Sequence, residues 1–459
     1  MAKEYTRMDK EPLVMREAPA SYQAMLDSLR VRPGYKQTEV GMIPEDWEVK
    51  QIGDLNPFVT SGSRGWAAFY SDRGAPFIRI TNLSRDSIYL DLEDLRLVSL
   101  PQEASEGIRT QLQDHDVLIS ITADIGIIGL VSEGVPKPAY INQHIALVRF
   151  DPSIIAPKFV SYFLASEKPQ KLFRALTDSG AKAGMSLLTV QKVYLALPPT
   201  KAEQEAIAEA LSDADALIES LEQLIAKKRH IKQGAMQELL SGKKRLPGFS
   251  GEWEVKLLGD LFNFSGGFSA SRDQLSTDGH CYLHYGDIHK SSKTYIDVRA
   301  EYQDIPKLDM PLKRISSGSL LDDGDVVFVD ASEDDEGTSK HVVVVNKDNT
   351  PYISGLHTIV AKSKFDNLDH IYRRYCFQTA AIKQQFYFFA VGTKVSGISK
   401  TNIAKVTLPV PSKPEQAAIA TILSDMDAEI AALEAKLAKT RSLKQGMMHN
   451  LLTGRIRLL

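Results

Sequence analysis

The sequence LSDADALIESLEQLIAKKRHIKQGAMQELLSGKKRL, from Leu211 to Leu246, recurs near the end of the chain as LSDMDAEIAALEAKLAKTRSLKQGMMHNLLTGRIRL, from Leu423 to Leu458. About 20 of the 36 positions are identical, and the two copies are offset by a constant 212 residues. Agreement without an insertion over so long a stretch indicates one structural element that is present twice.

Each copy is predicted to be a long helix. Thr200-x-x-Glu203 and Ser412-x-x-Glu415 match the capping box, and Gly242 and Gly454 can end a helix in the left-handed conformation. About 40 residues at ~1.5 Å each would make a rod of about 60 Å. Two unrelated surface helices are the alternative, but the matched caps and tails favour a pair.

Apolar residues recur in each copy at intervals of four and three, which is the pattern of a coiled-coil seam. We therefore expect the two helices to form an intramolecular antiparallel coiled coil. The predicted interface consists of Ile207, Leu211, Ile218, Leu221 and Ile225 in the first copy and Ile419, Leu423, Ile430, Leu433 and Leu437 in the second. A further row, Leu217, Leu224 and Ile231, widens the apolar face of the first copy and predicts more than one neighbour.

The repeat extends beyond the helices. IPEDWEVKQIGDL around Trp47 is followed 206 residues later by GEWEVKLLGDL around Trp253. Short apolar runs typical of buried strands follow in both halves, such as those after Asp116 and Asp325. We expect an α+β fold with a pseudo-two-fold internal repeat. Its parts would be an N-terminal helical arm (1–41), a first mixed domain (42–199), a central helix (200–246), a second mixed domain (247–411) and a C-terminal helix (412–459).

The composition is that of an ordinary globular protein. A chain of 459 residues can form two or three domains, and 43% hydrophobic and 25% charged residues are usual values. No apolar run reaches the ~20 residues of a membrane span, and the polar N-terminus lacks the apolar centre of a signal peptide. A cytoplasmic location is expected. The two cysteines, Cys281 and Cys376, are expected to be reduced and structural.

The motifs of several enzyme classes are missing. There is no glycine-rich cofactor loop after a strand, as a base methyltransferase would need, and no phosphate-binding Gly-x-x-x-x-Gly-Lys-Ser/Thr loop. The acidic run Asp330 to Glu336 could hold a hard cation, but a solvated loop explains it better. His280, Cys281 and His284 fall along a predicted strand with unsuitable spacing for zinc, and His144 and His357 are expected to be structural. No metal site is therefore expected.

Two similar but non-identical domains suit the reading of two different short DNA sequences. The net charge of −3 disfavours indiscriminate nucleic-acid binding, although local basic patches remain possible. Polar ends of matched loops would contact phosphates and base edges. The candidate DNA-binding residues are Arg64, Arg79, Asn82, Arg85 and Lys182 in the first domain and Arg272, His284, Asp287, Lys290 and Lys394 in the second.

These features together resemble the specificity subunit of type I restriction-modification systems. The resemblance covers nearly the whole chain from Gly34. It depends on GYKQTEVGMIPEDWEV (34–49), DVLISITADIGIIG (116–129), the joints LPPTKAEQEAIAEALSDAD and VPSKPEQAAIATILSDMD, and the helix ends KQGxM…LLxG. The second domain departs from the pattern at Asp330 to Glu336, where the first has an Ile-Gly turn.

The resemblance implies a non-catalytic subunit whose two mixed domains are target-recognition domains and whose repeated helices are a spacer. Its partners would be double-stranded DNA, two modification subunits that methylate adenine, and restriction subunits, with no membrane. The chain itself would hold no cofactor; S-adenosylmethionine, ATP and Mg would be used by the partner subunits. Two alternatives are a coiled-coil scaffold that binds no DNA and an enzyme with an unrecognised site.

Loss of a phosphate contact can be tested at two lysines. Lys182→Ala or Lys394→Ala is expected to weaken binding to all DNA sequences and to reduce the salt dependence of the association constant, because one fewer counterion is released. Titration of DNA binding at several salt concentrations measures this slope. If the slope is unchanged in both variants, neither lysine contacts a phosphate.

Overall fold

The computed structural model describes residues 32–101, 105–178, 184–289, 291, 293–332, 340–392 and 396–458. The chain divides into two compact units: unit 1 comprises Met1–Ser220 and Leu437–Leu459, and unit 2 comprises Leu221–Lys436. Residues 1–31 of the predicted helical arm lie outside the described residues. The prediction is wrong for the arm's described end, because β1 (Tyr35–Thr38) forms an antiparallel hairpin with β2 (Gly41–Pro44).

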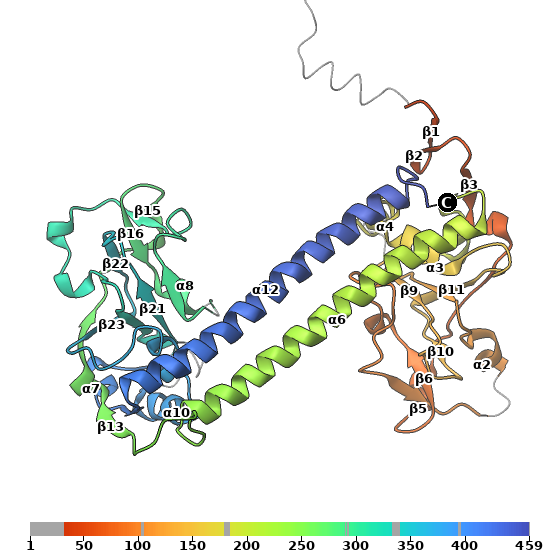
Figure 1. Ribbon diagram of the computed structural model, residues 1–459. Coiled ribbons are helices and arrows are strands. Elements are labelled where there is room, and N and C mark those ends of the chain that lie inside the picture. Colours follow the sequence, from red (N-terminus) through yellow and green to blue (C-terminus); the bar gives the residue numbers. More distant parts are fainter. Residues whose placement is uncertain are drawn as a thin grey trace, which may run out of the picture. The chain divides into compact units, whose positions relative to one another are not determined.

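Besides the β1–β2 hairpin, unit 1 contains two four-stranded sheets and a two-stranded ladder (Figure 1). The sheet orders are β4-β11-β8-β9, β10-β6-β7-β5 and β12-β3. The strands are β3 (Glu48–Gln51), β4 (Phe58–Ser61), β5 (Tyr70–Ser71), β6 (Ala75–Ile78), β7 (Arg96–Val98), β8 (Val117–Ser120), β9 (Ile128–Leu130), β10 (Tyr140–Ile141), β11 (Ile145–Arg149) and β12 (Tyr194–Leu197). The helices are α2 (Ser105–Thr110), α3 (Pro157–Ala165), α4 (Glu167–Asp178), α5 (Leu187–Gln191) and the first part of α6 (Lys201–Leu239), with 3-10 turns η1 (Ile52–Leu55), η2 (Trp66–Phe69) and η3 (Ile80–Asn82).

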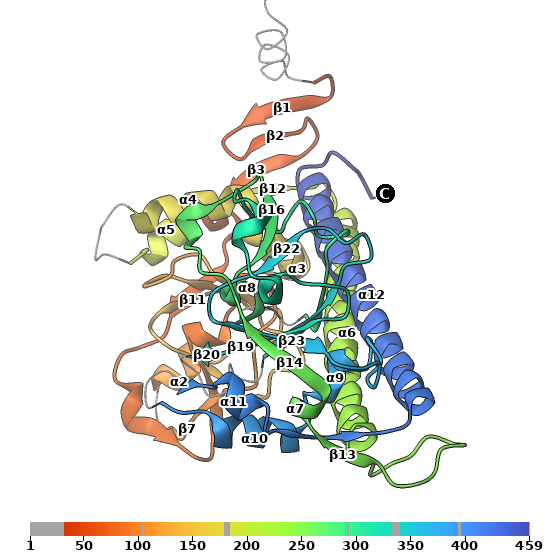
Figure 2. The same cartoon turned by 90° about the vertical axis from the view of Figure 1, so that its left-hand side faces the viewer.

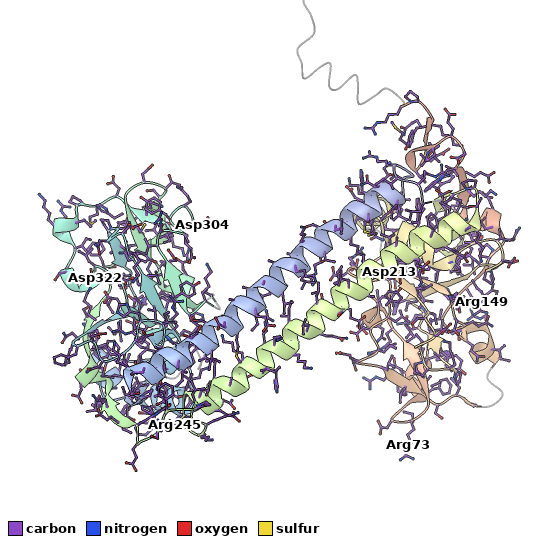
Figure 3. All side chains as sticks on the ribbon, in the orientation of Figure 1. Arg73, Arg149, Asp213, Arg245, Asp304 and Asp322 are labelled. Carbon is purple, nitrogen blue, oxygen red and sulfur yellow. The ribbon has the colours of Figure 1, made fainter. Side chains whose placement is uncertain are left out.

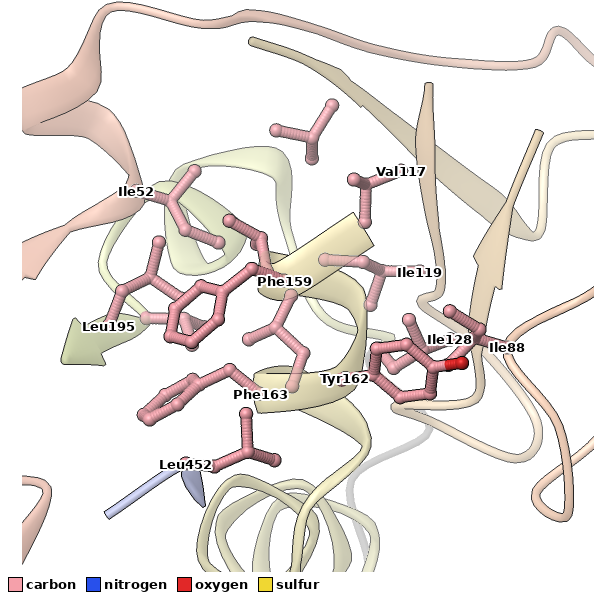
Figure 4. Close-up of a cluster of buried hydrophobic side chains, with 14 of the residues drawn as sticks. Ile52, Ile88, Val117, Ile119, Ile128, Phe159, Tyr162, Phe163, Leu195 and Leu452 are labelled. Atoms are coloured by element: carbon pink, nitrogen blue, oxygen red, sulfur yellow. The ribbon is translucent and has the colours of Figure 1, made fainter. Parts of the chain in front are cut away.

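Helix α3 is the centre of the unit 1 core. Pro157 occupies its first turn, where a missing backbone N–H costs nothing. Its Phe159 and Tyr162 are fully buried with Val117 of β8, and Leu452, just after the C-terminal helix, belongs to the same cluster (Figure 4). The end of the chain therefore completes the core of its first domain.

Unit 2 has a corresponding arrangement, with a fifth strand in its first sheet (Figure 2). Its sheet orders are β14-β23-β19-β21-β17, β15-β18-β16-β22, β13-β25 and β20-β24. The strands are β13 (Glu254–Leu257), β14 (Phe262–Gly266), β15 (Leu275–Ser276), β16 (His280–Leu283), β17 (Tyr295–Asp297), β18 (Lys307–Leu308), β19 (Val326–Val329), β20 (Ala331–Ser332), β21 (His341–Val345), β22 (Tyr352–Ser354), β23 (Thr358–Ser363), β24 (Ser396–Gly397) and β25 (Thr407–Val410). The helices are α7 (Leu258–Leu261), α8 (Tyr285–His289), α9 (Arg373–Cys376), α10 (Ala380–Phe389), α11 (Lys400–Ile403) and most of α12 (Lys413–Leu451), with 3-10 turns η4 (Arg272–Gln274), η5 (Leu312–Arg314) and η6 (Ser317–Ser319).

The two units have corresponding strand orders. The order β4-β11-β8-β9 of unit 1 corresponds to β14-β23-β19-β21 of unit 2, and β10-β6-β7-β5 corresponds to β22-β16-β18-β15. In each unit the second of these sheets includes one parallel pair, β6 with β10 and β16 with β22. The predicted buried strands after Asp116 and Asp325 are β8 and β19, and all their residues are buried.

A buried aspartate precedes each of these strands. Asp116 is bound by Arg149 of β11, and Asp325 is bound by Lys362 of β23, with N–O distances of 2.6 and 2.7 Å. Burial raises the pKa of both carboxyl groups, and the cationic partner opposes that rise. The two pairs hold equivalent neighbouring strands together.

The two long helices begin where the sequence predicts and end at Leu239 and Leu451, three residues before Gly242 and Gly454 and short of the predicted bounds 246 and 459. α6 and α12 start at Lys201 and Lys413, and Gly242 and Gly454 have φ of 72° and 66°. Within the described residues, no helix is long and apolar enough to cross a membrane.

The predicted capping glutamates bind arginines. The N–H of Glu203 donates to Thr200 Oγ1 as expected, but both carboxylate oxygens of Glu203 accept hydrogen bonds from Arg457. In unit 2, Arg245 and the Trp253 indole N–H donate to Glu415, which is 1% exposed. The basic tail of each repeat thus binds the first turn of the other repeat.

A second matched contact lies further along each helix. In unit 1, Asp215 of α6 accepts a hydrogen bond from Tyr162 of α3 at 2.7 Å and forms an ion pair with Lys444 of α12. In unit 2, Asp427 of α12 accepts a hydrogen bond from Tyr375 of α9 at 2.8 Å and forms an ion pair with Lys232 of α6. One carboxylate therefore joins a domain, its own helix and the partner helix.

Four of the ten predicted seam residues lie in domain cores, and the other six lie further along the two helices. Ile207 and Leu211 belong to the unit 1 core, and Ile419 and Leu423 belong to the unit 2 core. Leu221, Ile225 and Ile430 are buried, whereas Ile218, Leu433 and Leu437 are half-buried. The additional row Leu217, Leu224 and Ile231 is 43%, 38% and 47% exposed, so neither unit covers it.

Asp215 and its near neighbour Asp213 offer a matched test (Figure 3). Asp215→Asn is expected to destabilise unit 1 by about 3 kcal/mol, because Lys444, whose side chain is only 12% exposed, is left without its counterion. Asp213 is exposed, so Asp213→Asn should change stability by less than about 0.5 kcal/mol. Urea unfolding followed by tryptophan fluorescence measures both; equal effects would show that the Asp215 contacts contribute little.

Candidate nucleic-acid interface

Four segments of unit 1 meet at one end of its sheets. Because β6 and β10 are parallel, the residues that follow them, Arg79 and Asn142, leave the sheet at the same edge. The N–H of Ile121, after β8, donates to the His144 carbonyl at 2.9 Å, and the N–H of Met185 donates to the Ile121 carbonyl at 2.7 Å. We call residues 79–85, 121–126, 142–144 and 184–185 the loop edge of unit 1.

Unit 2 has the same arrangement of backbone contacts. The N–H of Asp330, after β19, donates to the His357 carbonyl at 3.1 Å, and the N–H of Ile398 donates to the Asp330 carbonyl at 2.8 Å. The parallel strands β16 and β22 lead into His284 and Gly355. Residues 284–289, 330–332, 355–357 and 396–398 form the loop edge of unit 2.

Arg64 extends from a loop whose preceding residues are held by two sets of contacts. Its own side chain is exposed. The preceding Gly62 lies so close to the loop edge that a Cβ there would be 2.3 Å from the Ile141 oxygen and the Asn142 backbone. Arg109 of α2 donates to Thr60 Oγ1, to the Ser61 carbonyl and to Ser63 Oγ, which fixes the loop from the other side.

Asn82 is a correction to the predicted set of DNA contacts. It is 1% exposed; its amide oxygen accepts from the Arg79 N–H, and its amide nitrogen donates to the carbonyls of Asp91 and Asp94. The residue was expected to be accessible because it follows a strand, but the chain folds back over it. Arg79 is partly exposed and donates to the carbonyl and carboxylate of Asp94.

Arg85 is held within the loop edge of unit 1. It forms an ion pair with Asp124 and donates to the Ile125 carbonyl at 3.1 Å and to Gln170 Oε1 at 2.5 Å. About a third of its side chain is exposed, at 34%. Gln170 also donates to the Gly126 carbonyl, so Arg85 and Gln170 together stabilise the turn after β8.

Three of the candidates in unit 2 form one polar cluster. Arg272 of η4 lies 3.2 Å from Asp287 Oδ1 and 3.3 Å from His284 Nδ1. The N–H of Gly286 donates to the same His284 nitrogen at 3.0 Å. Burial, and then the positive charge of Arg272, lowers the pKa of His284, so this imidazole is neutral near pH 7.

The two matched histidines differ in their contacts. His144 has both ring nitrogens engaged, Nδ1 with Thr122 Oγ1 and Nε2 with the Gln143 side chain at 2.9 Å. The sequence expectation of a satisfied histidine fits His144. His357 is 49% exposed, and its Nδ1 lies 3.4 Å from Asp330 Oδ1.

A family model for the type I restriction modification DNA specificity domain matches residues 44–227 and again residues 250–440. The chain belongs to this family. As a specificity subunit it recognises a DNA target and is not itself catalytic; methyltransferase and nuclease activities belong to partner subunits.

Curated relatives and solved structures agree with this assignment. The specificity subunit is 26% identical to the putative MjaX specificity subunit of Methanocaldococcus jannaschii over 92% of this chain and 96% of the relative. It is 22% identical to the EcoBI specificity subunit of Escherichia coli over 44% of this chain and 42% of the relative. The crystal structure of the specificity subunit from M. genitalium has the same fold, with 14% identity and a TM-score of 0.55 over 92% of this chain and 97% of that chain.

Some functional candidates of the specificity subunit are not placed. Lys182, Lys290 and Lys394 lie outside the described residues, as does the acidic run from residue 333 to 336. In the described part of the chain, no three His, Cys, Asp or Glu side chains are grouped to hold a metal. His280 and Cys281 lie on β16 as predicted, and Cys281 is buried.

Sequence reasoning missed Arg109, Gln170 and Tyr285. Arg109 and Gln170 position loops from helices distant in sequence, so no local motif marks them. The Tyr285 ring packs against that of His284 in a tilted arrangement, with ring centroids 4.7 Å apart. Its position directly after that candidate was the one available signal.

The Gly62 contact predicts sensitivity to one methyl group. Gly62→Ala is expected to destabilise unit 1 by about 1 to 3 kcal/mol, because the added Cβ would force apart two backbone segments. Gly134→Ala is a suitable control, since its Cβ would meet only Ser132 Oγ at 3.8 Å. Thermal unfolding of the two variants measures the difference. Similar stabilities would mean that the Arg64 loop is free to move away from the loop edge.

Proposed function

We propose that this specificity subunit reads a bipartite, asymmetric DNA target, with one half read by the loop edge of each unit. The observation that carries the proposal is that both units have the same strand order but expose different side chains. Unit 1 presents Arg64, Arg79 and Arg85, whereas unit 2 presents Arg272, His284 and Asp287. A shared framework with different polar loops suits two different base sequences.

We further propose that α6 and α12 form an intramolecular antiparallel coiled coil that acts as the spacer and gives the chain its pseudo-two-fold repeat. Contacts within unit 2 support the direction. Lys228 pairs with Glu429 and Lys232 pairs with Asp427, so the partners on α12 move towards its N-terminus as α6 advances. Within unit 1, the earlier residue of α6 pairs with the later residue of the second repeat: Glu203 pairs with Arg457, whereas Asp215 pairs with Lys444.

The helices also offer a surface for partner subunits. Leu224 and Ile231 are exposed on α6 and are spaced seven residues apart, which places them on one face. We propose that two modification subunits dock on such apolar faces of the helices and that restriction subunits join this assembly. In this proposal S-adenosylmethionine, ATP and Mg are used by the partner subunits, and this chain holds no cofactor. A solved structure with the same fold, reported for type I complex assembly, has a TM-score of 0.52 with 15% identity.

Lengthening both helices tests the spacer. Four extra residues after Ala226 and after Ala438 add close to one turn, ~5.4 Å, and keep the apolar seam nearly in phase. The gap between the two half-targets is expected to grow by about one to two base pairs, since a base pair rises ~3.4 Å. Selection of bound DNA from a randomised pool with the modification complex measures the gap. An unchanged gap with unchanged half-targets would show that the helices do not set the spacing.

The same selection separates the proposal from a scaffold function. A scaffold that binds only proteins would enrich no DNA sequence, whereas the proposed subunit should enrich two short motifs.

The four-residue insertion has a matched control. One extra residue after Ala226 and after Ala438 should rotate the seam by about 100° and disrupt helix pairing.

A further inference from the structure

We propose that His357 is a base-reading residue of unit 2, positioned by Asp330 so that its Nε2 accepts a hydrogen bond from a base amino group. This inference rests on the proposed reading of one half-target by the loop edge of unit 2. His357 lies outside the set of predicted DNA contacts, because its sequence context predicts a structural histidine.

The backbone presents His357 at the loop edge. The residue lies between β22 and β23, its side chain is 49% exposed, and its φ is +60°. A non-glycine residue with positive φ is held there by its surroundings. Here the His357 carbonyl accepts from the Asp330 N–H, which fixes the backbone against the end of β19.

The Asp330 carboxylate lies beside one ring nitrogen of His357 and biases which nitrogen carries the proton. Asp330 Oδ1 is buried without a hydrogen bond from any described residue, and His357 Nδ1 is 3.4 Å away. Burial raises the pKa of Asp330, and the adjacent imidazole opposes that rise. An ionised carboxylate can only accept, so it favours the tautomer with the proton on Nδ1 and leaves Nε2 as an acceptor.

The neighbours of His357 hold its ring and set its electrostatic environment. Tyr285 meets the His357 ring edge-on, with centroids 5.4 Å apart and planes at 81°. The Tyr285 ring also packs against that of His284, tilted by 32°. Arg272 and Asp287 lie beyond His284 and pair with each other. The ring thus has a carboxylate on one side and the Tyr285 ring on another.

Comparison with unit 1 shows what is particular to His357. The equivalent His144 uses both nitrogens within the protein. None of the described residues hydrogen-bonds to Nε2 of His357, so that nitrogen is available to a ligand. In the major groove, amino groups that can donate to it are N6 of adenine and N4 of cytosine.

Two substitutions at this position distinguish reading from structure. In His357→Gln the amide lies near the place of Nε2, whereas in His357→Asn it lies near the place of Nδ1. Asparagine also tolerates positive φ better than most residues. If His357 reads a base, the Gln variant should therefore keep more DNA affinity than the Asn variant. If its role is purely structural, the Asn variant should keep more affinity than the Gln variant.

The experiment measures affinity of the modification complex for its selected target and for targets changed at each base pair of the unit 2 half. His357→Asn should lose roughly 5- to 100-fold in affinity and lose the preference at one A·T or G·C pair. His357→Gln should retain more of both. Asp330→Asn should weaken the same preference, and the double variant Asp330→Asn with His357→Asn should be no worse than His357→Asn alone.

His370 provides a matched control in the same unit. Its Nδ1 lies 3.5 Å from Asp323 Oδ2 and its side chain is 46% exposed, but it lies outside the loop edge. His370→Asn should leave every base preference unchanged. The proposal is overturned if His357→Asn keeps all preferences or exceeds His357→Gln in affinity at equal melting temperature. Failure of the wild-type complex to prefer any sequence would instead overturn the proposed function itself.

Discussion

The structure depends on carboxylates that join three elements at once. Asp215 and Asp427 each bind a tyrosine of their own domain and a lysine of the other long helix. The Asp215–Lys444 pair is mostly shielded from water, with both side chains 12% exposed, so losing either partner would leave a poorly solvated charge, which favours docking of all three elements together. The Asp427–Lys232 pair is more open to solvent, since the Asp427 side chain is 39% exposed. The Glu203–Arg457 and Glu415–Arg245 contacts add the same requirement at the helix ends.

This requirement explains why the helix pair is more than a hydrophobic seam. Ile207 and Ile419 were assigned to the seam from their spacing, yet they lie in domain cores that also contain residues from the end of the other repeat. Each domain core therefore contains the start of one long helix and the end of the other. The apolar stripe along a helix shows which face is buried but does not identify the neighbour that covers it.

The sequence predicted the architecture well because the architecture is duplicated. Matched signals in two copies indicated the helices, their ends at Gly242 and Gly454, and the buried strands after Asp116 and Asp325. The candidate site was predicted less well. Asn82 was expected to be exposed but is covered by residues 91–94, and Arg109 acts on a loop 46 to 49 residues away. Such contacts depend on tertiary folding, which no local pattern records.

The likeness of the two domain–helix junctions has a consequence for how such chains can diversify. Gln204 and Gln416 each accept a hydrogen bond from a backbone N–H of the preceding domain, from Ala156 and Asp369, and Tyr162 and Tyr375 approach their helices in the same way. A genetic crossover within the duplicated helix would exchange whole domains while every junction contact found an equivalent partner. New combinations of recognition surfaces could thus arise by recombination without any need for compensating mutations in the framework.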